Sequence, residues 1–221
     1  VWRHVIRATV VHETKHLASL SERLARGASV FEESWLEEAS AMAAMEIWGR
    51  AFTGAQWKGH VSYAQDLYCE VRPTTPSCAG HPYVMFDHFA YLYDYLSAVE
   101  THSPLGGVDY TDATFYGSGW ALLRWAADQY AGSEAGFFRA LTQETSLSGV
   151  ANLEARTGHP FSEMSADWGL ATVLGVHYAN ARPTRAQLTE PSWNLNDVFA
   201  GMWQDFPQYF GGTMPQPMGA L

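Results

Sequence analysis

Hydrophobic and polar residues recur at intervals of three and four along much of the chain, which is the period of an α-helix. A first helix is predicted over about residues 4–25, ending at Gly27, and a second over about residues 34–48, ending at Gly49. Strand-like alternation is weak, so the chain is predicted to be mainly α. The residues expected on one face of the first helix are Val5, Thr9, His12, His16 and Leu20.

The C-terminal part, about residues 81–221, has the same helical character. Pro82 is expected in the first turn of an aromatic-rich helix, and Ser148 and Ser162 are expected as N-caps. The tail from residue 183 is rich in Pro, Gly, Asn and Trp and is predicted to be irregular around one short helix. No repeat or linker is visible, so residues 1–221 are predicted to be a single domain. The helices expected here cover residues 81–100, 114–130, 134–142, 149–158 and 162–175.

Composition narrows the class of protein. The chain is 47% hydrophobic and 16% charged, which excludes intrinsic disorder. Its formal net charge of −10 argues against nucleic acid and anionic membrane surfaces as partners. No apolar run approaches the roughly 20 residues of a membrane-spanning helix. These features favour a folded protein with no membrane span.

Two cysteines, Cys69 and Cys78, flank a stretch rich in Pro, Thr and Gly. This arrangement predicts a disulfide and an extracytoplasmic setting, with two free thiols as the alternative. The chain begins at Val1 without a Met or a signal-peptide pattern. We therefore expect that an upstream segment has been removed or left out.

Residues 12–16 read His12-Glu13-Thr14-Lys15-His16, an H-E-x-x-H pattern inside the first predicted helix. Residues four apart on a helix share a face, so both imidazoles can reach one zinc ion. Glu13 is then placed to act on water bound to that metal. The pattern is rare by chance and predicts a catalytic zinc site.

A catalytic zinc needs a third protein ligand, and four glutamates compete for that role: Glu32, Glu33, Glu37 and Glu38. Ser34 and Glu37 fit a capping box, which would give Glu37 a structural task. Glu32 and Glu33 precede the helix. Glu38 is therefore the predicted third ligand, with Glu37 as the alternative.

These motifs resemble those of the gluzincin zinc peptidases. His12-Glu13-x-x-His16 is followed by Trp35-Leu-Glu-Glu-Ala39, and VVHETKHLAS, EESWLEEASA and FYGSGWALLRWAADQYAG are similar to segments of the hyicolysin-like bacterial neutral metallopeptidases. The resemblance is closest over residues 4–50 and extends to residues 110–160. It implies a zincin-like fold, Zn²⁺ as cofactor, His12, His16 and Glu38 as zinc ligands, and Glu13 as the general base.

The sequence departs from that family at two positions. Lys15 stands where an uncharged residue is usual, and Ala39 replaces a glycine. Lys15 is expected to point into solvent, because a buried lysine beside a cation would weaken metal binding. The β-rich portion that precedes the motif helix in these peptidases is largely absent from this chain. The chain is expected to be the helical part of a larger catalytic unit.

Other residues are candidates for supporting roles. The resemblance makes Tyr116 the donor to the oxyanion, with a packed aromatic as the alternative and His102 and His177 as weaker candidates. Asp87-His88 could orient a ligand. A calcium loop at Asp109 and Asp112, beside Gly106 and Gly107, is a further hypothesis without a matching loop pattern.

The predicted function is zinc-dependent hydrolysis of peptide bonds in a peptide or protein substrate. The expected enzyme is a secreted or cell-surface metallopeptidase of bacterial type, and an endopeptidase, because no anchor for a free amino terminus is visible. The alternative is a catalytically incomplete zinc-binding or surface-adhesion module derived from such a peptidase.

Overall fold

The computed structural model describes residues 2–106, 112–178 and 180–209. Within these ranges the chain contains helices and no strand, with one isolated parallel bridge between Val61 and Trp193. The mainly α prediction is therefore confirmed. In chain order the elements are α1 (Trp2–Ala25), α2 (Ser34–Thr53), α3 (Tyr68–Val71), η1 (Pro76–Cys78), α4 (Met85–Leu96), α5 (Thr114–Tyr130), α6 (Glu134–Thr142), α7 (Gly149–Thr157), α8 (Phe161–His177), η2 (Ala186–Leu188) and α9 (Leu195–Asp205).

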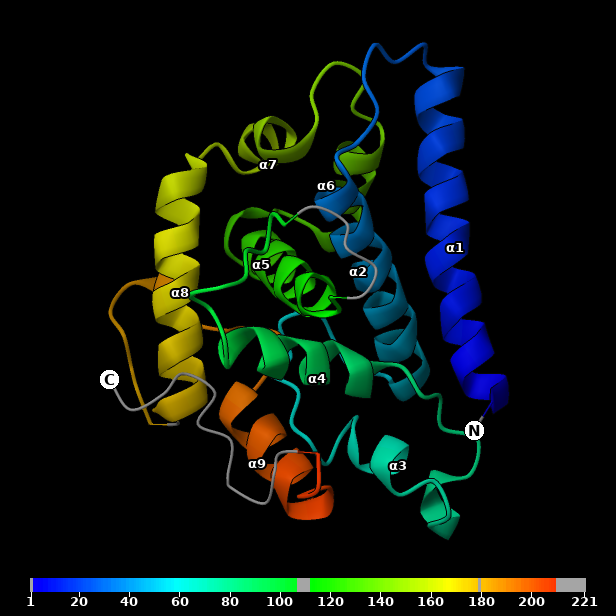
Figure 1. The fold of residues 1–221 in the computed structure, drawn as a ribbon, viewed down its shortest axis with the longest axis vertical. Coiled ribbons are helices and arrows are strands. Elements are labelled where there is room, and N and C mark those ends of the chain that lie inside the picture. Colours follow the sequence, from blue (N-terminus) through cyan, green and yellow to red (C-terminus); the bar gives the residue numbers. More distant parts are fainter. Residues whose placement is uncertain (1, 107–111, 179, 210–221) are drawn as a thin grey trace.

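Helix α5 lies in the middle of the molecule, α1 forms one edge and α8 the opposite edge (Figure 1). α5 packs against both α2 and α4, and α2 separates it from α1. Gly117 permits the close approach of α5 to α4, because a Cβ atom there would lie 2.3 Å from the backbone nitrogen of Leu92. This packing brings the start of α5 close to the α1–α2 pair.

Helix α2 extends beyond its predicted end. Gly49 does not stop it: this glycine is buried inside the helix, where an added Cβ would lie 3.3 Å from the side chain of Val84. The helix ends instead at Gly54, which has a left-handed φ of 78°. The added turns carry Arg50 into the core. Packing against the α4 entry segment therefore decides the role of Gly49.

The C-terminal helices agree with the sequence pattern more closely. α5 and α6 have the predicted bounds, and α7 follows Ser148 as predicted, although the Ser148 side chain makes no capping hydrogen bond. Ser162 is not an N-cap, because α8 begins at Phe161 after Pro160. The helix predicted over 81–100 is shorter, so Pro82 precedes it rather than lying in its first turn. α9 is the short helix expected in the tail.

The side of α1 that packs on the rest of the protein differs from the predicted one. Its inward side carries small and polar residues, and Thr9 and Leu20, both expected on the packed face, are exposed. The polar stripe of α1 packs on α2, so the apolar residues of this helix face outward. The residues on the inward face include Ala8, His12, His16, Ser19 and Arg23, and large apolar residues exposed on the outward face are Ile6, Val10, Leu17, Leu20 and Leu24.

Cys69 and Cys78 form the predicted disulfide. It joins α3 to η1 across one turn-rich segment, far along the chain from the H-E-x-x-H pattern. None of the helices in the described ranges combines the length and apolar character that a bilayer span requires.

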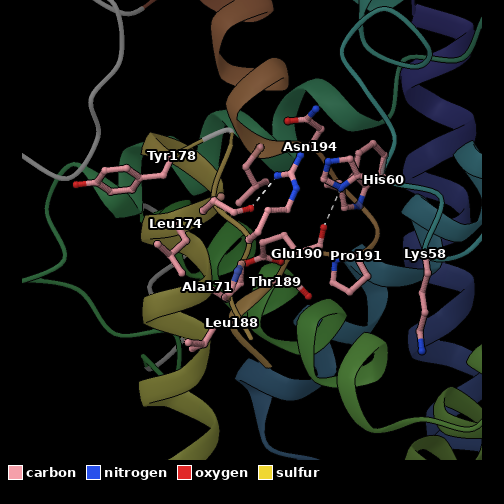
Figure 2. Close-up of a pocket in the computed structure, with 16 residues that line it drawn as sticks. Lys58, His60, Ala171, Leu174, Tyr178, Leu188, Thr189, Glu190, Pro191 and Asn194 are labelled. Carbon is pink, nitrogen blue, oxygen red and sulfur yellow. Dashed lines mark hydrogen bonds between the residues drawn. The ribbon is translucent and has the colours of Figure 1, made fainter. Parts of the chain in front are cut away.

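A cavity of about 400 Å³ lies between α8 and the segment that leads into α9 (Figure 2). Its lining includes His60 and Glu190, and the Nδ1 atom of His60 lies 3.2 Å from the backbone oxygen of Glu190. Lys58 and His60 both have positive φ values, 56° and 49°. The cavity shares no lining residue with the H-E-x-x-H pattern, so it is separate from the site described next.

Candidate metal centre

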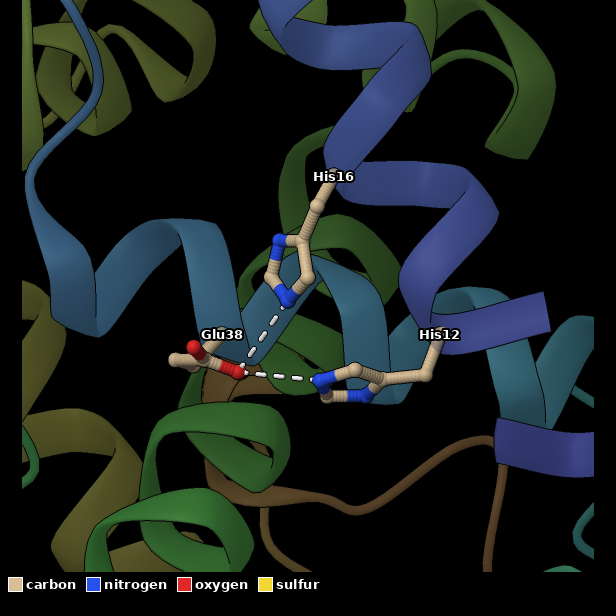
Figure 3. Close-up of side chains that lie close together, drawn as sticks. All are labelled: His12, His16 and Glu38. Atoms are coloured by element: carbon tan, nitrogen blue, oxygen red, sulfur yellow. Dashed lines mark hydrogen bonds and ion pairs between the residues drawn. The ribbon is translucent and has the colours of Figure 1, made fainter. Parts of the chain in front are cut away.

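Helices α1 and α2 bring His12, His16 and Glu38 together (Figure 3). The Nε2 atoms of His12 and His16 lie 3.0 and 3.4 Å from the same Glu38 oxygen, Oε2. One donor atom from each of the three residues lies within 4.8 Å of the others, and all three side chains are half-buried. The two histidines face α2 because they stand one turn apart on the inward stripe of α1.

This donor set fits a zinc ion. Two imidazole nitrogens and one carboxylate oxygen are ligands that zinc uses in catalytic sites. Atoms bound at about 2.0–2.2 Å in a tetrahedral arrangement lie roughly 3.3–3.6 Å apart. The separations between Glu38 Oε2 and the two imidazoles, 3.0 and 3.4 Å, need only small adjustments to meet this requirement. Half-burial leaves one side of the cluster accessible.

The four competing glutamates have different partners. Glu32 forms a 2.8 Å ion pair with Arg23, and Glu33 accepts a 2.9 Å hydrogen bond from the indole nitrogen of Trp35. Glu37 contacts His16 from the side away from Glu38. Only Glu38 contacts both histidines, so the geometry favours it as the third ligand.

Glu37 supports the centre instead of capping α2. The cap position is Glu33, and the Glu37 carboxylate accepts hydrogen bonds from the Ser19 hydroxyl and the His16 Nδ1 atom, each at 3.0 Å. The predicted capping box between Ser34 and Glu37 is therefore wrong. When His16 is neutral, its ring carries one N–H hydrogen, so a bond from Nδ1 to Glu37 leaves the Nε2 lone pair for a metal.

The prediction that Lys15 points into solvent is also wrong. Its Nζ atom lies 2.8 Å from Glu37 Oε2, and its side chain is only 13% exposed. Burial lowers the pKa of Lys15, against the opposing effect of Glu37. Lys15 therefore neutralises Glu37 inside the α1–α2 contact, where it also contacts Ser19. The sequence pattern contained both residues but no signal that they would pair.

Titration of the cluster reflects these contacts. Burial alone would raise the pKa of Glu38, but hydrogen bonds from His12 and His16, and their charge, lower it to about 2. Hydrogen bonds with Glu37 and then with Glu38 raise the pKa of His16 to about 9, against desolvation. The Glu38 carboxylate is thus ionised at neutral pH, whereas His16 has to release a proton before its Nε2 atom can bind a metal.

Of the two predicted catalytic residues, Tyr116 lies near a candidate ligand, whereas Glu13 is placed only by its position next to His12 in the chain. Glu13 follows His12 on α1, and its side chain is exposed. Tyr116 stands in the first turn of α5, with its ring centroid 6.3 Å from that of His12, and it also packs against Phe115 and Tyr91. Three helices therefore contribute to the surroundings of the candidate ligands.

The remaining candidates lie outside the cluster. His102 pairs with Asp112 at 3.4 Å, and His177 ends α8 beside Tyr178. The ring nitrogens of His88 lie 2.9 Å from the backbone oxygens of Val84 and Met42, which makes it a core residue.

Asp112 accepts hydrogen bonds from the backbone nitrogen and hydroxyl of Thr114, so it stabilises the start of α5. Asp109 and Gly107, which belong to the calcium hypothesis, lie outside the described residues.

Comparisons with known proteins return no match: no protein-family model, no curated protein and no solved structure is significantly similar to this chain. The gluzincin resemblance stays a prediction, and the functional argument depends on the geometry of the site.

Proposed function

We propose that this protein is a zinc-dependent peptidase in which His12, His16 and Glu38 hold the metal. The observation that carries the proposal is the convergence of both imidazoles on one carboxylate oxygen, at 3.0 and 3.4 Å. When bound, zinc supplies a Lewis acid and lowers the pKa of a coordinated water. Peptide hydrolysis at such a centre further needs a base and a donor to the oxyanion.

Glu13 is the proposed general base. It is adjacent to a ligand and exposed, so it is accessible from solvent. Its carboxylate would take a proton from the attacking water and deliver it to the departing amine. Tyr116, near His12, would donate its hydroxyl hydrogen to the oxyanion that forms at the scissile carbonyl. These roles complete the reaction with residues of this chain.

The supporting network has a positioning role in this proposal. Glu37 accepts from His16, and Lys15 and Ser19 hold Glu37. The Cys69–Cys78 disulfide supports an extracytoplasmic enzyme. The net charge of −10 favours peptide or protein substrates over nucleic acid.

The deciding experiment compares the wild-type protein with Glu13→Gln. We expect both to bind one zinc per chain by elemental analysis, while the variant hydrolyses a fluorogenic peptide mixture about 10²–10⁴-fold more slowly. Glu22→Gln is the matched control, because Glu22 is an exposed carboxylate on the same helix, paired with Arg26. Chelator should abolish hydrolysis by the wild type.

Tyr116→Phe tests the oxyanion donor. We expect zinc to be retained and kcat to fall about 10²-fold, the usual effect of removing one such donor. Tyr91→Phe is the control, since Tyr91 packs on Tyr116 from α4.

A wild type that binds zinc yet hydrolyses no peptide would favour the incomplete zinc-binding or adhesion module instead.

A further inference from the structure

A second cavity adjoins the candidate metal centre. It has a volume of about 310 Å³, and His16 and Glu37 form part of its wall. The remaining lining residues are Ser19, Leu20, Arg23, Phe31 and Glu32. His16 therefore belongs both to the wall of this cavity and to the set of candidate metal ligands. A group seated in the cavity would contact a candidate metal ligand.

The charged groups of the lining are paired with each other or with the neighbouring protein. The Arg23 guanidinium forms an ion pair with Glu32 at 2.8 Å and donates to the backbone oxygen of Val30. The other Glu32 oxygen accepts from the backbone nitrogen of Gly149. These bonds leave Arg23 and Glu32 at 2% and 5% side-chain exposure. The two charges of this floor thus compensate each other, although the buried Nε atom of Arg23 has no hydrogen-bond partner among the described residues.

Glu37, the other acidic lining residue, is also neutralised. Lys15 contacts one of its oxygens at 2.8 Å, and His16 contacts the other at 3.0 Å. With this pair satisfied, the lining presents no uncompensated charge that would select a basic or an acidic group.

Two large apolar side chains stand in the more exposed part of the lining. Leu20 is 47% exposed on α1, and Phe31 is 53% exposed on the connection to α2. Both would be removed from water by an apolar group that entered between them, which is favourable. The cavity is also at the lower end of the size range of ligand pockets, about 300–1,000 Å³, and suits one side chain better than a whole ligand.

We propose that this cavity, the His16 side pocket, binds one apolar side chain of a peptide substrate, aliphatic or aromatic, at a residue close to the cleaved bond. The inference rests on the proposed peptidase function for its substrate. Its own basis is the shared His16 wall, the paired floor and the exposed Leu20 and Phe31. The side pocket would thereby select where the chain is cut.

Cleavage of a peptide library, read by mass spectrometry, tests this selection. We expect apolar residues to be enriched at one fixed position near the cut site. Leu20→Ala and Phe31→Ala should each lower kcat/KM for those peptides about 10-fold, with a smaller change for peptides carrying serine there. Leu24→Ala is the matched control, because Leu24 is 60% exposed one turn further along α1 and does not line the pocket.

A binding measurement separates failure of this inference from failure of the peptidase proposal. Blocked pentapeptides with a central Phe or a central Ser are titrated calorimetrically into Glu13→Gln protein loaded with zinc. Tighter binding of the Phe peptide, lost in Leu20→Ala and Phe31→Ala, supports the pocket even if wild type cleaves nothing. Equal binding of both peptides, or cleavage without apolar enrichment, overturns it even if zinc-dependent hydrolysis is confirmed.

Discussion

Two glutamates on α2, eight positions apart, occupy opposite kinds of environment. Glu46 is fully buried, and its oxygens accept hydrogen bonds from the indole nitrogens of Trp120 and Trp193 and from Arg124, at 2.8–3.0 Å. Glu38 is 13% exposed at the side chain, and His12 and His16 are its partners. One carboxylate is enclosed by donors, and the other faces groups that can also bind a metal.

The difference distinguishes a structural carboxylate from a candidate metal ligand on the same helix. Donors around Glu46 come from α2, α5 and the segment before α9, so its bonds hold three parts of the core together. Its pKa is lowered by Arg124 and Arg50 despite the effect of burial, which keeps it charged and paired. Glu38 contacts side chains whose nitrogens can exchange a proton for a metal. Solvent access, together with partners that can exchange a proton for a metal, distinguishes the candidate metal centre.

The contrast between Glu46 and Glu38 predicts that their substitution has unequal effects on stability. Glu46→Gln should lower the free energy of unfolding by about 3 kcal/mol, because it removes one buried charge partner of Arg50 and Arg124, which both remain paired with Glu134. Glu38→Gln should lower it by about 1 kcal/mol or less, since its partners are partly solvated. Urea unfolding in chelator, followed by circular dichroism, measures both. Equal losses would show that the metal centre is also a structural cluster.

The segment closed by the disulfide contains neither glutamate, so its loss should affect stability and not zinc binding. Cys69→Ala with Cys78→Ala should lower the free energy of unfolding by about 2–3 kcal/mol, the loop-closure value for a short loop. Zinc affinity of the folded protein should be unchanged, because neither cysteine contacts the candidate ligands. Denaturation and a competitive zinc titration test the two statements. A large fall in zinc affinity would show that the regions are coupled.

Glu37 and Lys15, which support His16, are predicted to affect zinc affinity. Glu37→Gln should weaken zinc binding about 10–100-fold, because His16 loses a charged acceptor at Nδ1. Lys15→Met should weaken it less, since it acts on His16 only through Glu37. Competition with a chromophoric chelator measures each affinity, and Glu22→Gln is the surface control. Unchanged affinity in Glu37→Gln would remove Glu37 from the centre.

The smallest effect expected is a pH dependence of stability in metal-free protein. The pKa of Glu38 falls from 4.5 to about 2, and that of His16 rises from 6.5 to about 9. Their pairing therefore stabilises the fold fully between pH 4.5 and 6.5, and less as pH falls toward 2 or rises through 9. Partial exposure limits the contribution to about 1 kcal/mol.

Urea unfolding of the wild type and of Glu38→Gln at pH 3, 5.5 and 9.5, in the presence of a chelator, tests this pH dependence of stability. The difference between the two proteins should be largest at the middle pH. A difference that is constant across the three conditions would contradict the pairing.

Local patterns predicted much of the helical architecture. The bounds of α5 and α6 followed from periodicity, because their apolar faces and their punctuating residues agree. The end of α2 could not be predicted, since Gly49 lies inside the helix, where the lack of a side chain leaves room for Val84. The inward face of α1 was predicted wrongly because its packed stripe is polar. From its hydrophobic pattern alone, the opposite side of that helix would be predicted to face inward.

The sequence by itself determined which atoms could bind a metal: two imidazoles one helical turn apart and a carboxylate on the next helix. Only the tertiary structure brought one of the four glutamates, Glu38, into contact with both histidines, because such a contact depends on the rotation and separation of α1 and α2. It also buried Lys15 against Glu37 and placed a pocket beside His16. Spacing along a chain defines neighbours within one helix, whereas contacts between helices arise from packing of the whole core.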